Sequence, residues 1–316
     1  MADAARPRVL VCDPLDEHAL EILGHETRLD VRTGLNRDEL IDIVADFDAL
    51  VVRSATQVTS EVLEAGSLLR VVARAGVGVD NIDVEAATER GILVVNAPGA
   101  STQAVAELTI GLIMSLLRRI PIADHTMKAG RWEKAHLRGR EFAGKTLGVI
   151  GYGRIGHEVA GIARAFGARV VVYTVLTRPI EHGQAVGFEE LLTESDIITV
   201  HVNYTATATS LIDAGTIARM KDGVYLINTS RGGIIDETAL LEALESGKVA
   251  GVGLDVFVDE PPGASPLVRH PHVVCTPHIG ASTAEAQRAV GAIAAHSLLA
   301  VLRGERPDTI VNPQAR

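Results

Sequence analysis

Aromatic residues are scarce in this chain: they make up 3% of its 316 residues, and Trp132 is the only tryptophan. Alanine, valine, isoleucine and leucine dominate the apolar residues instead. A core of this composition favours many short buried strands and helices that pack through aliphatic contacts. The apolar fraction of 47% and the charged fraction of 22% are ordinary for a globular protein and argue against broad disorder.

Cysteine, positive charge and long apolar runs are also limited. The two cysteines, Cys12 and Cys275, lie in apolar runs, which predicts buried, reduced thiols under cytosolic conditions. The net charge of −10 argues against a nucleic-acid binder, which usually carries a basic face. The most hydrophobic segment, residues 103–117, contains Glu107 and is shorter than the ~20 residues that span a bilayer. Because the N-terminus also lacks the apolar run of a signal peptide, we expect a cytoplasmic protein with no membrane contact.

Short apolar runs alternate with amphipathic stretches along most of the chain, which is typical of βαβ units on parallel sheets. The first series of runs predicts strands at Val9–Cys12, Ala49–Val52, Arg70–Ala73 and Ile92–Val95. The second series predicts strands at Thr146–Ile150, Arg169–Tyr173, Asp196–Val200, Gly223–Asn228, Val249–Asp255 and Val273–Thr276.

The length predicts about two domains, and the apolar helix 103–117 separates the two series. Asp236 is expected to cap a helix at Glu237–Glu245 that Gly247 ends. The tail after Ser282 returns to a helical pattern, which we expect to pack on the first series. The predicted domains are therefore a discontinuous one, 1–98 plus 283–316, and an inserted one, 99–282.

A glycine motif follows the fifth predicted strand. Residues 151–156, GYGRIG, give G-x-G-x-x-G between an apolar strand and a helical pattern. Gly151 permits the tight turn, Gly153 lets a pyrophosphate approach the backbone, and Gly156 allows close packing of helix on strand. The helix N-terminus adds amide donors and the positive end of its dipole. In this context the motif predicts dinucleotide binding.

The acidic residue that usually holds the ribose of NAD, about 20 positions further on, is missing. The strand that ends at Tyr173 is followed by Thr174, and no carboxylate occurs until Glu181. Thr174, together with Thr177 and Arg178, is suited to receive the 2′-phosphate of NADP. Alternatively, backbone groups hold the ribose and selectivity is weak. NAD and NADP are therefore both candidate cofactors.

Several blocks of residues resemble, in order and spacing, the D-isomer-specific 2-hydroxyacid dehydrogenases, and most closely the D-3-phosphoglycerate dehydrogenases among them. These blocks are VVRSATQVT (51–59), ARAGVGVDNID (73–83), NTSRGGIIDETAL (228–240), LDVFVDEPP (254–262) and TPHIGASTAEAQ (276–287). The resemblance implies an α/β protein with two doubly wound parallel-sheet domains, a flavodoxin-like substrate domain and a Rossmann cofactor domain, with a cleft between them. It also implies an oxidoreductase that transfers a hydride between NAD(P) and the alpha carbon of a small 2-hydroxy or 2-oxo acid.

Arg231, Glu260 and His278 match the three catalytic positions of that family. The planar fork of an arginine such as Arg231 can grip a 2-oxo acid bidentately and polarise its carbonyl. Imidazole titrates near neutrality, so His278 is suited to deliver or accept the proton. A carboxylate such as Glu260 would orient the ring and favour its protonated form. His270 and His272 are expected to be loop residues, and no metal site is expected, because no supporting Cys or His spacing is present.

The resemblance also implies where substrate and cofactor bind. Arg53 and Arg74 match positions that hold a substrate phosphate, although salt bridges within the domain are the alternative, and the amides of Gly76–Gly78 would cradle a carboxylate. The expected substrate contacts are Arg53, Ser54, Arg74, Gly76, Val77, Gly78 and Ser101. The expected cofactor contacts are Gly151, Gly153, Arg154, Ile155, Gly156, Tyr173, Thr174, Arg178, Val202, Asn203, Thr229, Ser230, Asp255 (toward the nicotinamide carboxamide) and Gly280.

The chain departs from the family pattern at three positions. Thr174 replaces the ribose-binding acid, Asn203 stands where relatives usually carry proline, and Ser101 stands in place of the usual asparagine near the substrate. The sequence ends at Arg316, which is typical of a short form without the C-terminal regulatory domain, so feedback inhibition by serine is not expected.

The expected partner is a small anionic metabolite, with 3-phosphoglycerate/3-phosphohydroxypyruvate as the first candidate. The alternatives are a hydroxypyruvate or glyoxylate reductase, a dehydrogenase of a phosphonate analogue, and an NAD(H)-sensing interaction protein similar to the C-terminal binding protein corepressors. The segment RWEK (131–134) resembles the arm that reaches toward a partner subunit in this family. That resemblance implies a homodimer formed through the Rossmann domain.

Overall fold

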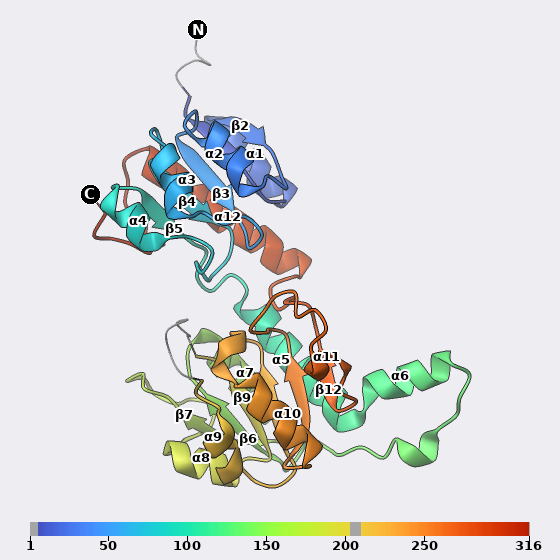
Figure 1. The fold of residues 1–316 in the computed structure, drawn as a ribbon. Helices are drawn as coiled ribbons and strands as arrows, with labels where there is room; N and C mark the ends of the chain where they lie inside the picture. Colours follow the sequence, from blue (N-terminus) through green and yellow to red (C-terminus); the bar gives the residue numbers. More distant parts are fainter. Residues whose placement is uncertain (1–5, 203–209, 316) are drawn as a thin grey trace. The chain divides into compact units, whose positions relative to one another are not determined.

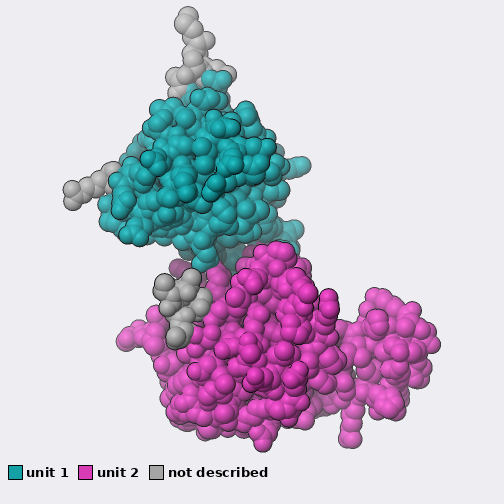
Figure 2. Space-filling view, viewed as in Figure 1, with its two compact units in different colours: residues 1–101, 282–316 teal, residues 102–281 magenta. Residues whose placement is uncertain are grey.

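The computed structural model describes residues 6–202 and 210–315, which divide into two compact units (Figures 1 and 2). Unit 1 comprises Met1–Ser101 and Ser282–Arg316, and unit 2 comprises Thr102–Ala281. The sequence analysis places these boundaries at 98/99 and 282/283.

Unit 1 contains a five-stranded sheet in the order β2-β1-β3-β4-β5, with each neighbouring pair parallel. This is the strand order of flavodoxin-like folds. The elements are β1 (Arg8–Val11), α1 (Glu17–Glu26), β2 (Arg28–Val31), α2 (Arg37–Val44), β3 (Ala49–Val52), α3 (Ser60–Ala65), β4 (Val71–Arg74), α4 (Val84–Glu89), β5 (Leu93–Val95) and α12 (Ala284–Leu302).

Alternate residues of these strands supply two separate cores, as the two-residue period of a strand requires. Leu50 and Val52 of β3 pack under α2, α3 and α4, whereas Ala49 and Val51 face α1 and α12. Because both faces are covered, β3 is fully buried, which explains its uninterrupted apolar sequence. Gly291 of α12 lets that helix lie against α1, since a Cβ there would come within 2.8 Å of the Ala19 Cβ.

Unit 2 contains a seven-stranded sheet in the order β12-β11-β10-β9-β6-β7-β8, again with parallel neighbours. Its elements are α5 (Thr102–Arg118), α6 (Ile120–Lys128), η2 (Lys134–His136), β6 (Thr146–Ile150), α7 (Arg154–Ala165), β7 (Arg169–Tyr173), β8 (Gln184–Ala185), α8 (Phe188–Glu194), β9 (Ile197–Val200), α9 (Ala214–Arg219), β10 (Val224–Asn228), η3 (Gly232–Ile234), α10 (Glu237–Glu245), β11 (Val249–Leu254), α11 (Pro266–Arg269) and β12 (Val273–Cys275).

The two faces of this sheet are covered in the same way. Leu147 and Val149 of β6 pack against α5 and α7, and Ile150 joins the opposite core with α8, α9 and α10. The predicted doubly wound α/β architecture is thus confirmed in both units. The order of the sheet reverses at β6, so that β6 and β9 lie side by side, and a crevice at such a point is the usual ligand site of an open α/β sheet.

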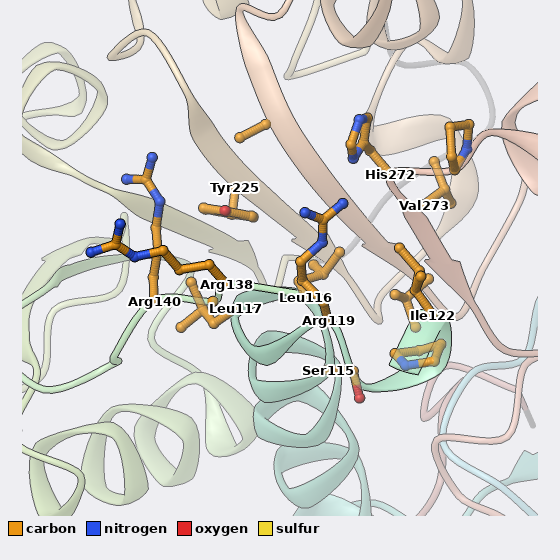
Figure 3. Close-up of a pocket in the computed structure, with 15 residues that line it drawn as sticks. Ser115, Leu116, Leu117, Arg119, Ile122, Arg138, Arg140, Tyr225, His272 and Val273 are labelled. Carbon is orange, nitrogen blue, oxygen red and sulfur yellow. The ribbon is translucent and has the colours of Figure 1, made fainter. Parts of the chain in front are cut away.

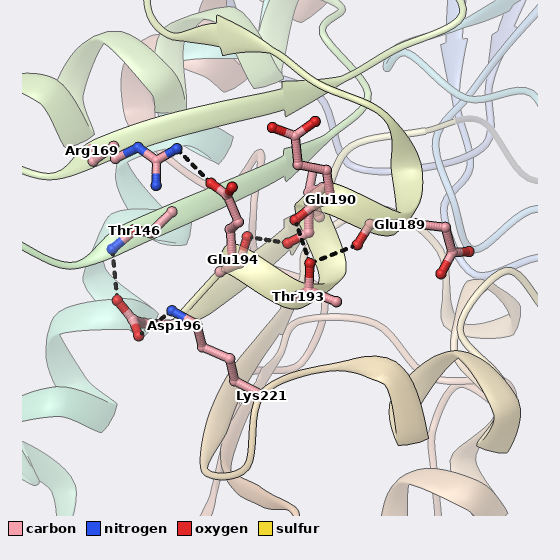
Figure 4. A network of polar contacts seen from close by, with 10 residues as sticks. Thr146, Arg169, Glu189, Glu190, Thr193, Glu194, Asp196 and Lys221 are labelled. Carbon is pink, nitrogen blue, oxygen red and sulfur yellow. Dashed lines mark hydrogen bonds and ion pairs between the residues drawn. The ribbon is translucent and has the colours of Figure 1, made fainter.

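Polar contacts tie together the amino-terminal edge of the unit 2 sheet (Figure 4). Asp196, just before β9, accepts the Thr146 amide of β6 at 2.8 Å and the Lys221 Nζ at 3.1 Å. Arg169, the first residue of β7, bonds Glu194 at the end of α8. This edge is therefore occupied by structural pairs, and the candidate site lies at the opposite, carboxyl edge.

The sequence-based elements need three corrections. The strands β2 and β8 were not predicted: β2 has no fully buried residue and β8 has only two residues, both exposed. Cys12 is buried as expected, but Cys275 is only partly buried because β12 is the edge strand of its sheet. Both thiols are free. Among the described residues, no helix has the length and apolar character needed to cross a membrane.

Candidate active site

The glycine motif lies where β6 passes into α7. Gly151 has φ +93°, and a Cβ there would come within 2.3 Å of the His201 carbonyl oxygen beside β9. A Cβ on Gly156 would come within 2.1 Å of the Gly151 carbonyl oxygen, so the third glycine is required for packing of the helix on the turn. These are the backbone roles that a dinucleotide fold assigns to the first and third glycines.

The second glycine leaves space for a ligand. Gly153 caps α7 without a side-chain hydrogen bond, and a Cβ built on it would meet no atom within 4 Å. The first amides of α7, at Arg154 and Ile155, are therefore open to an anion at the positive end of a twelve-residue helix. The residues present fit the pyrophosphate of a nicotinamide dinucleotide.

The remaining expected cofactor contacts follow the carboxyl ends of neighbouring strands. Tyr173 ends β7, and Thr174 follows it, with its Oγ1 accepting the Leu176 amide at 3.1 Å. The guanidinium of Arg178 lies 5.3 Å from the centre of the Tyr152 ring, beside the glycine motif. Val202 follows β9, Thr229 and Ser230 follow β10, Asp255 follows β11, and Gly280 follows β12. Asn203 lies outside the described residues.

The structure brings Glu260 and His278 into direct contact. His278 Nδ1 lies 2.6 Å from Glu260 Oε2, while Glu260 Oε1 accepts the Phe257 amide at 3.1 Å. Both side chains are partly exposed, 45% for the histidine and 38% for the glutamate, so the pair is accessible to a small molecule. With Nδ1 bonded to the carboxylate, Nε2 is the ring atom left to exchange a proton.

The environment keeps Glu260 ionised. Burial by itself would raise the pKa of the Glu260 carboxyl. The hydrogen bond and charge of His278, the Phe257 amide and the nearby Arg231 guanidinium outweigh that effect and hold the pKa below its usual value. The charged carboxylate is therefore the partner that orients the His278 ring through Nδ1.

Asp255 positions the histidine loop, a role that sequence reasoning missed. Its carboxylate is buried and accepts the Thr276 hydroxyl at 2.6 Å and the amides of Ile279 and Gly280 at 2.8 Å each. The backbone of His278 adopts φ +51°, which is uncommon for a residue with a side chain. The surrounding hydrogen bonds offset that cost, so the strained backbone presents the imidazole in one place.

Arg231 lies on a loop whose shape depends on main-chain contacts. The Asn228 side chain donates to the Arg231 carbonyl at 2.7 Å and accepts the Ser230 amide at 3.0 Å. Gly232 allows this loop to pack on the next one, because a Cβ there would lie 2.0 Å from the Phe257 carbonyl carbon. The Arg231 Nη1 donates to the Ser230 carbonyl at 2.7 Å. Arg231, Glu260 and His278 are thus gathered at one edge of unit 2.

Thr229 and Ser230 are held by structural partners in the same region. The hydroxyl of Thr229 lies 2.9 Å from that of Thr109 on α5, and the Ser230 hydroxyl donates to the Val200 carbonyl of β9. These contacts hold the segment that follows β10 against α5 and β9.

In unit 1, Arg53 and Arg74 come to the same sheet edge. Arg74 is the last residue of β4 and pairs in register with Val52, which precedes Arg53. The guanidinium of Arg74 lies against Gly76, where a Cβ would fall 1.3 Å from Nη1. Val77 is exposed and its carbonyl accepts the Asn96 side chain at 2.6 Å, whereas Ser101 is buried. The structure thus places the Arg74 side chain beside Gly76, whereas Arg53 Nη1 donates to the Pro14 carbonyl at 3.3 Å.

Two further polar residues hold this edge in shape, and no motif in the sequence pointed to them. Asp13 is buried and accepts the Arg53 amide and, at 3.0 Å, the Thr56 hydroxyl. The Asn81 side chain donates to the carbonyls of Arg53 (2.8 Å) and Thr56 (2.6 Å). The turn after β3, which includes the exposed Ser54, is therefore fixed from both sides.

A cavity of about 240 Å³ lies elsewhere in unit 2 (Figure 3). Arg119, Arg138 and Arg140 line it together with Tyr225 and His272. Tyr225 is near the start of β10 and His272 precedes β12, so the cavity is at the amino-terminal edge of the sheet, away from His278. It is therefore separate from the candidate active site.

Comparison with known proteins identifies similar chains. The family model described as "D-isomer specific 2-hydroxyacid dehydrogenase, NAD binding domain" matches residues 110–280. A D-3-phosphoglycerate dehydrogenase of Methanocaldococcus jannaschii is 48% identical over 96% of this chain, and the chain spans only 59% of that relative's length. A hydroxypyruvate reductase of Thermotoga maritima is 50% identical over 91% of this chain and 95% of its own length.

A solved structure, a glyoxylate reductase from Paecilomyes thermophila, superimposes with a TM-score of 0.89 at 33% identity, covering 99% of this chain and 100% of that one.

Proposed function

Because the chain belongs to the D-isomer-specific 2-hydroxyacid dehydrogenase family, we propose that it interconverts a small anionic 2-hydroxy acid and its 2-oxo acid. The observation that carries this proposal is the 2.6 Å contact between Glu260 and His278, with Arg231 close enough to lower the pKa of that glutamate. An acid–base group, its orienting carboxylate and an arginine for the substrate form a complete set for this chemistry.

A nicotinamide dinucleotide held at the glycine motif, Gly151–Gly156, would when bound supply the hydride for reduction and accept it in oxidation. His278 delivers the proton from Nε2 to the carbonyl oxygen during reduction, and takes the hydroxyl proton back in the reverse direction. Arg231 binds the carboxylate and carbonyl of the 2-oxo acid and polarises the C=O bond. Glu260 keeps the ring in one tautomer through Nδ1, so the proton is always exchanged at Nε2.

For the substrate we propose 3-phosphohydroxypyruvate and its reduced form, 3-phosphoglycerate. Support comes from Arg53 and Arg74, two cations at adjacent strand ends, of which Arg74 lies beside Gly76. An arginine pair of this kind suits a dianionic phosphate, because guanidinium groups bind phosphate bidentately. The similarity to D-3-phosphoglycerate dehydrogenases agrees with this choice.

The test is oxidation of NADH and NADPH by the purified chain with 3-phosphohydroxypyruvate, and with hydroxypyruvate for comparison. We expect the phosphorylated acid to have the higher kcat/KM, and Arg53→Ala or Arg74→Gln to reduce that value by about 10–100-fold, the cost of a charged hydrogen bond. Hydroxypyruvate turnover should change little. Arg70→Ala is the matched control, because Arg70 precedes β4 and donates to the Leu302 carbonyl at the other end of the strand.

Equal losses for both acids would contradict the phosphate role of Arg53 and Arg74. The same assay tests the cofactor. Since Thr174 stands in place of the ribose-binding acid and no carboxylate occurs until Glu181, we expect NADPH to support turnover as well as NADH does. A strong preference for NADH would contradict that interpretation of Thr174.

Hydroxypyruvate reduction is the second candidate function. The Thermotoga maritima relative that carries this name is 50% identical over 91% of this chain. A higher kcat/KM for hydroxypyruvate than for 3-phosphohydroxypyruvate, unchanged in Arg53→Ala, would favour this function. Absence of turnover with either acid would point to another anion, such as a phosphonate, or to a nicotinamide-sensing role.

A homodimer formed through unit 2 is also part of the proposal. In Figure 1, α6 and the segment after it extend away from the sheet of unit 2. They expose large apolar side chains, with Ile120 50%, Met127 54% and Trp132 77% accessible. Sedimentation should give twice the 33.4 kDa of one chain, and Trp132→Glu should shift the species toward monomer. Leu68→Glu, at an exposed site of unit 1, should leave the dimer intact, and a monomeric unmodified chain would contradict the proposal.

A further inference from the structure

Unit 2 carries a cluster of metal-ligating side chains that the proposed reaction does not use. The cluster consists of His157 on α7 and of Glu181 and His182 just before β8, and their ligand atoms all lie within 4.8 Å of one another. His157 Nε2 is 3.6 Å from Glu181 Oε2, and the two imidazole rings have their centres 4.7 Å apart. Both histidines are half-buried and the glutamate is exposed. The sequence analysis expected no metal site, because it found no supporting Cys or His spacing; these three residues come from two separate segments.

Neighbouring groups hold the backbone of Glu181 and His182 in place. The His182 amide donates to the Tyr152 hydroxyl at 3.0 Å, and Arg164 Nη1 donates to the Glu181 carbonyl at 3.0 Å. Gly161 leaves room for the His182 ring on α7, because a Cβ there would lie 3.2 Å from the ring Cδ2. The two ligands of this segment are therefore positioned against the helix that carries the third.

His157 also has the orienting partner that metal-bound histidines usually have. Its Nδ1 lies 3.2 Å from Glu158 Oε1, while its Nε2 faces Glu181. A carboxylate on one ring nitrogen fixes the tautomer and makes the other nitrogen a better ligand. His157 is thus arranged to present Nε2 to a cation held jointly with Glu181 and His182.

The donor set selects the kind of ion. Two imidazoles and a carboxylate suit Zn²⁺ and related transition metals, whereas Mg²⁺ and Ca²⁺ prefer oxygen ligands. Ligand atoms at about 2.0–2.1 Å from a tetrahedral Zn²⁺ are about 3.3 Å apart. The distance of 3.6 Å between His157 Nε2 and Glu181 Oε2 is close to that spacing. Rotation of the exposed Glu181 side chain and of the His182 ring would bring the remaining ligand atoms to it.

We propose that His157, Glu181 and His182 bind one Zn²⁺ ion, with water in the remaining position. The ion would join α7, whose first turn follows the glycine motif, to the segment between β7 and β8 that contains Thr174 and Arg178. Metal binding would therefore fix that segment against the helix. The proposal concerns a site of its own and does not depend on the enzymatic reaction.

Titration calorimetry with ZnSO₄ on the full chain, freed of any histidine tag and stripped by a chelator, tests the site. We expect one ion per chain, with affinity at least about tenfold weaker in His157→Gln and in His182→Gln. Thermal unfolding of the unmodified chain should rise by about 5–10 °C when the Zn²⁺ concentration is a hundred times the Kd. The control is His270→Gln combined with His272→Gln. These two histidines, the first partly buried and the second exposed, have ring centres 5.6 Å apart and belong to no such cluster among the described residues.

Circular dichroism and unfolding without metal check that each variant is folded. Should a histidine variant fail to fold, Glu181→Gln replaces it, since that side chain is exposed and its loss should also weaken binding. Absence of stoichiometric binding, binding that is unchanged in these variants, or binding that is lost in the His270/His272 control would each overturn the proposal.

Discussion

Replacement of His278 by glutamine is expected to abolish most turnover while leaving cofactor binding intact. Glutamine retains a hydrogen-bonding group of similar size but cannot accept and release a proton at neutral pH. General acid–base catalysis typically contributes 10²–10⁴-fold, so kcat should fall by about that factor. The glycine motif and α7, which we propose as the pyrophosphate site, make none of their described contacts with His278.

The measurement is the steady-state rate with the preferred 2-oxo acid, combined with a fluorescence titration of the reduced cofactor. His272→Gln serves as the control, because His272 is an exposed histidine at the opposite edge of the same sheet. A loss of cofactor affinity equal to the loss of rate would mean that His278 has a structural role. Normal turnover in His278→Gln would remove it from the mechanism altogether.

Glu260→Gln extends the same prediction to the carboxylate that orients the ring. The pKa of Glu260 is held below its usual value, so the carboxylate is charged where it contacts His278 Nδ1 at 2.6 Å. An amide in its place carries no charge and has a single acceptor oxygen, so we expect kcat to fall by about 10–100-fold, the value of a charged hydrogen bond. Steady-state kinetics combined with a cofactor titration measures this change. An unchanged kcat would show that Glu260 does not act through His278.

The elements of the fold could be predicted accurately where the local sequence alone determines where an element begins and ends. The strands β3, β6 and β7 match their predicted ranges because each is buried on both faces and bounded by polar residues or glycine. The helix α10 matches as well, since Asp236 accepts the amides of Thr238 and Ala239 at its start. The edge strand β2 was not predicted. Its residues are all at least partly exposed and do not alternate between buried and exposed, so only its pairing with β1 defines it as a strand.

The contacts within the candidate site, by contrast, could not be predicted from local sequence. The residues of the trio could be named from their motifs, but the contact between Glu260 and His278 depends on how two loops meet, which no local pattern encodes. Asp255 illustrates the point, because it follows a strand and resembles a cofactor contact, yet both of its oxygens accept hydrogen bonds from the loop that carries His278. The supporting roles of Asp13 and Asn81 in unit 1 are similarly long-range and became visible only in the structure.

Arg231→Gln is expected to reduce kcat/KM by about 10²–10³-fold, because it removes the cation that stabilises negative charge on the substrate oxygen. Arg231→Lys should recover only part of this loss, since an ammonium cannot grip a carboxylate and a carbonyl with two parallel donors. The loop should keep its shape in both variants. Its fixed points are the Asn228 contact to the Arg231 carbonyl and the packing of Gly232 on Phe257, and neither uses the guanidinium.

Steady-state kinetics, cofactor titration and thermal unfolding of each variant separate this role from a structural one. Arg219→Gln is the matched control, because Arg219 is a half-exposed arginine of α9 that pairs with Glu189 at 3.0 Å, a surface pair of small energetic value. Full activity in Arg231→Lys would show that charge alone suffices and that the bidentate grip is not used. A fall in melting temperature that matches the loss of activity would assign Arg231 to the fold. If only kcat/KM falls, the guanidinium acts on the substrate, and the short Glu260–His278 contact and Arg231 operate as one site.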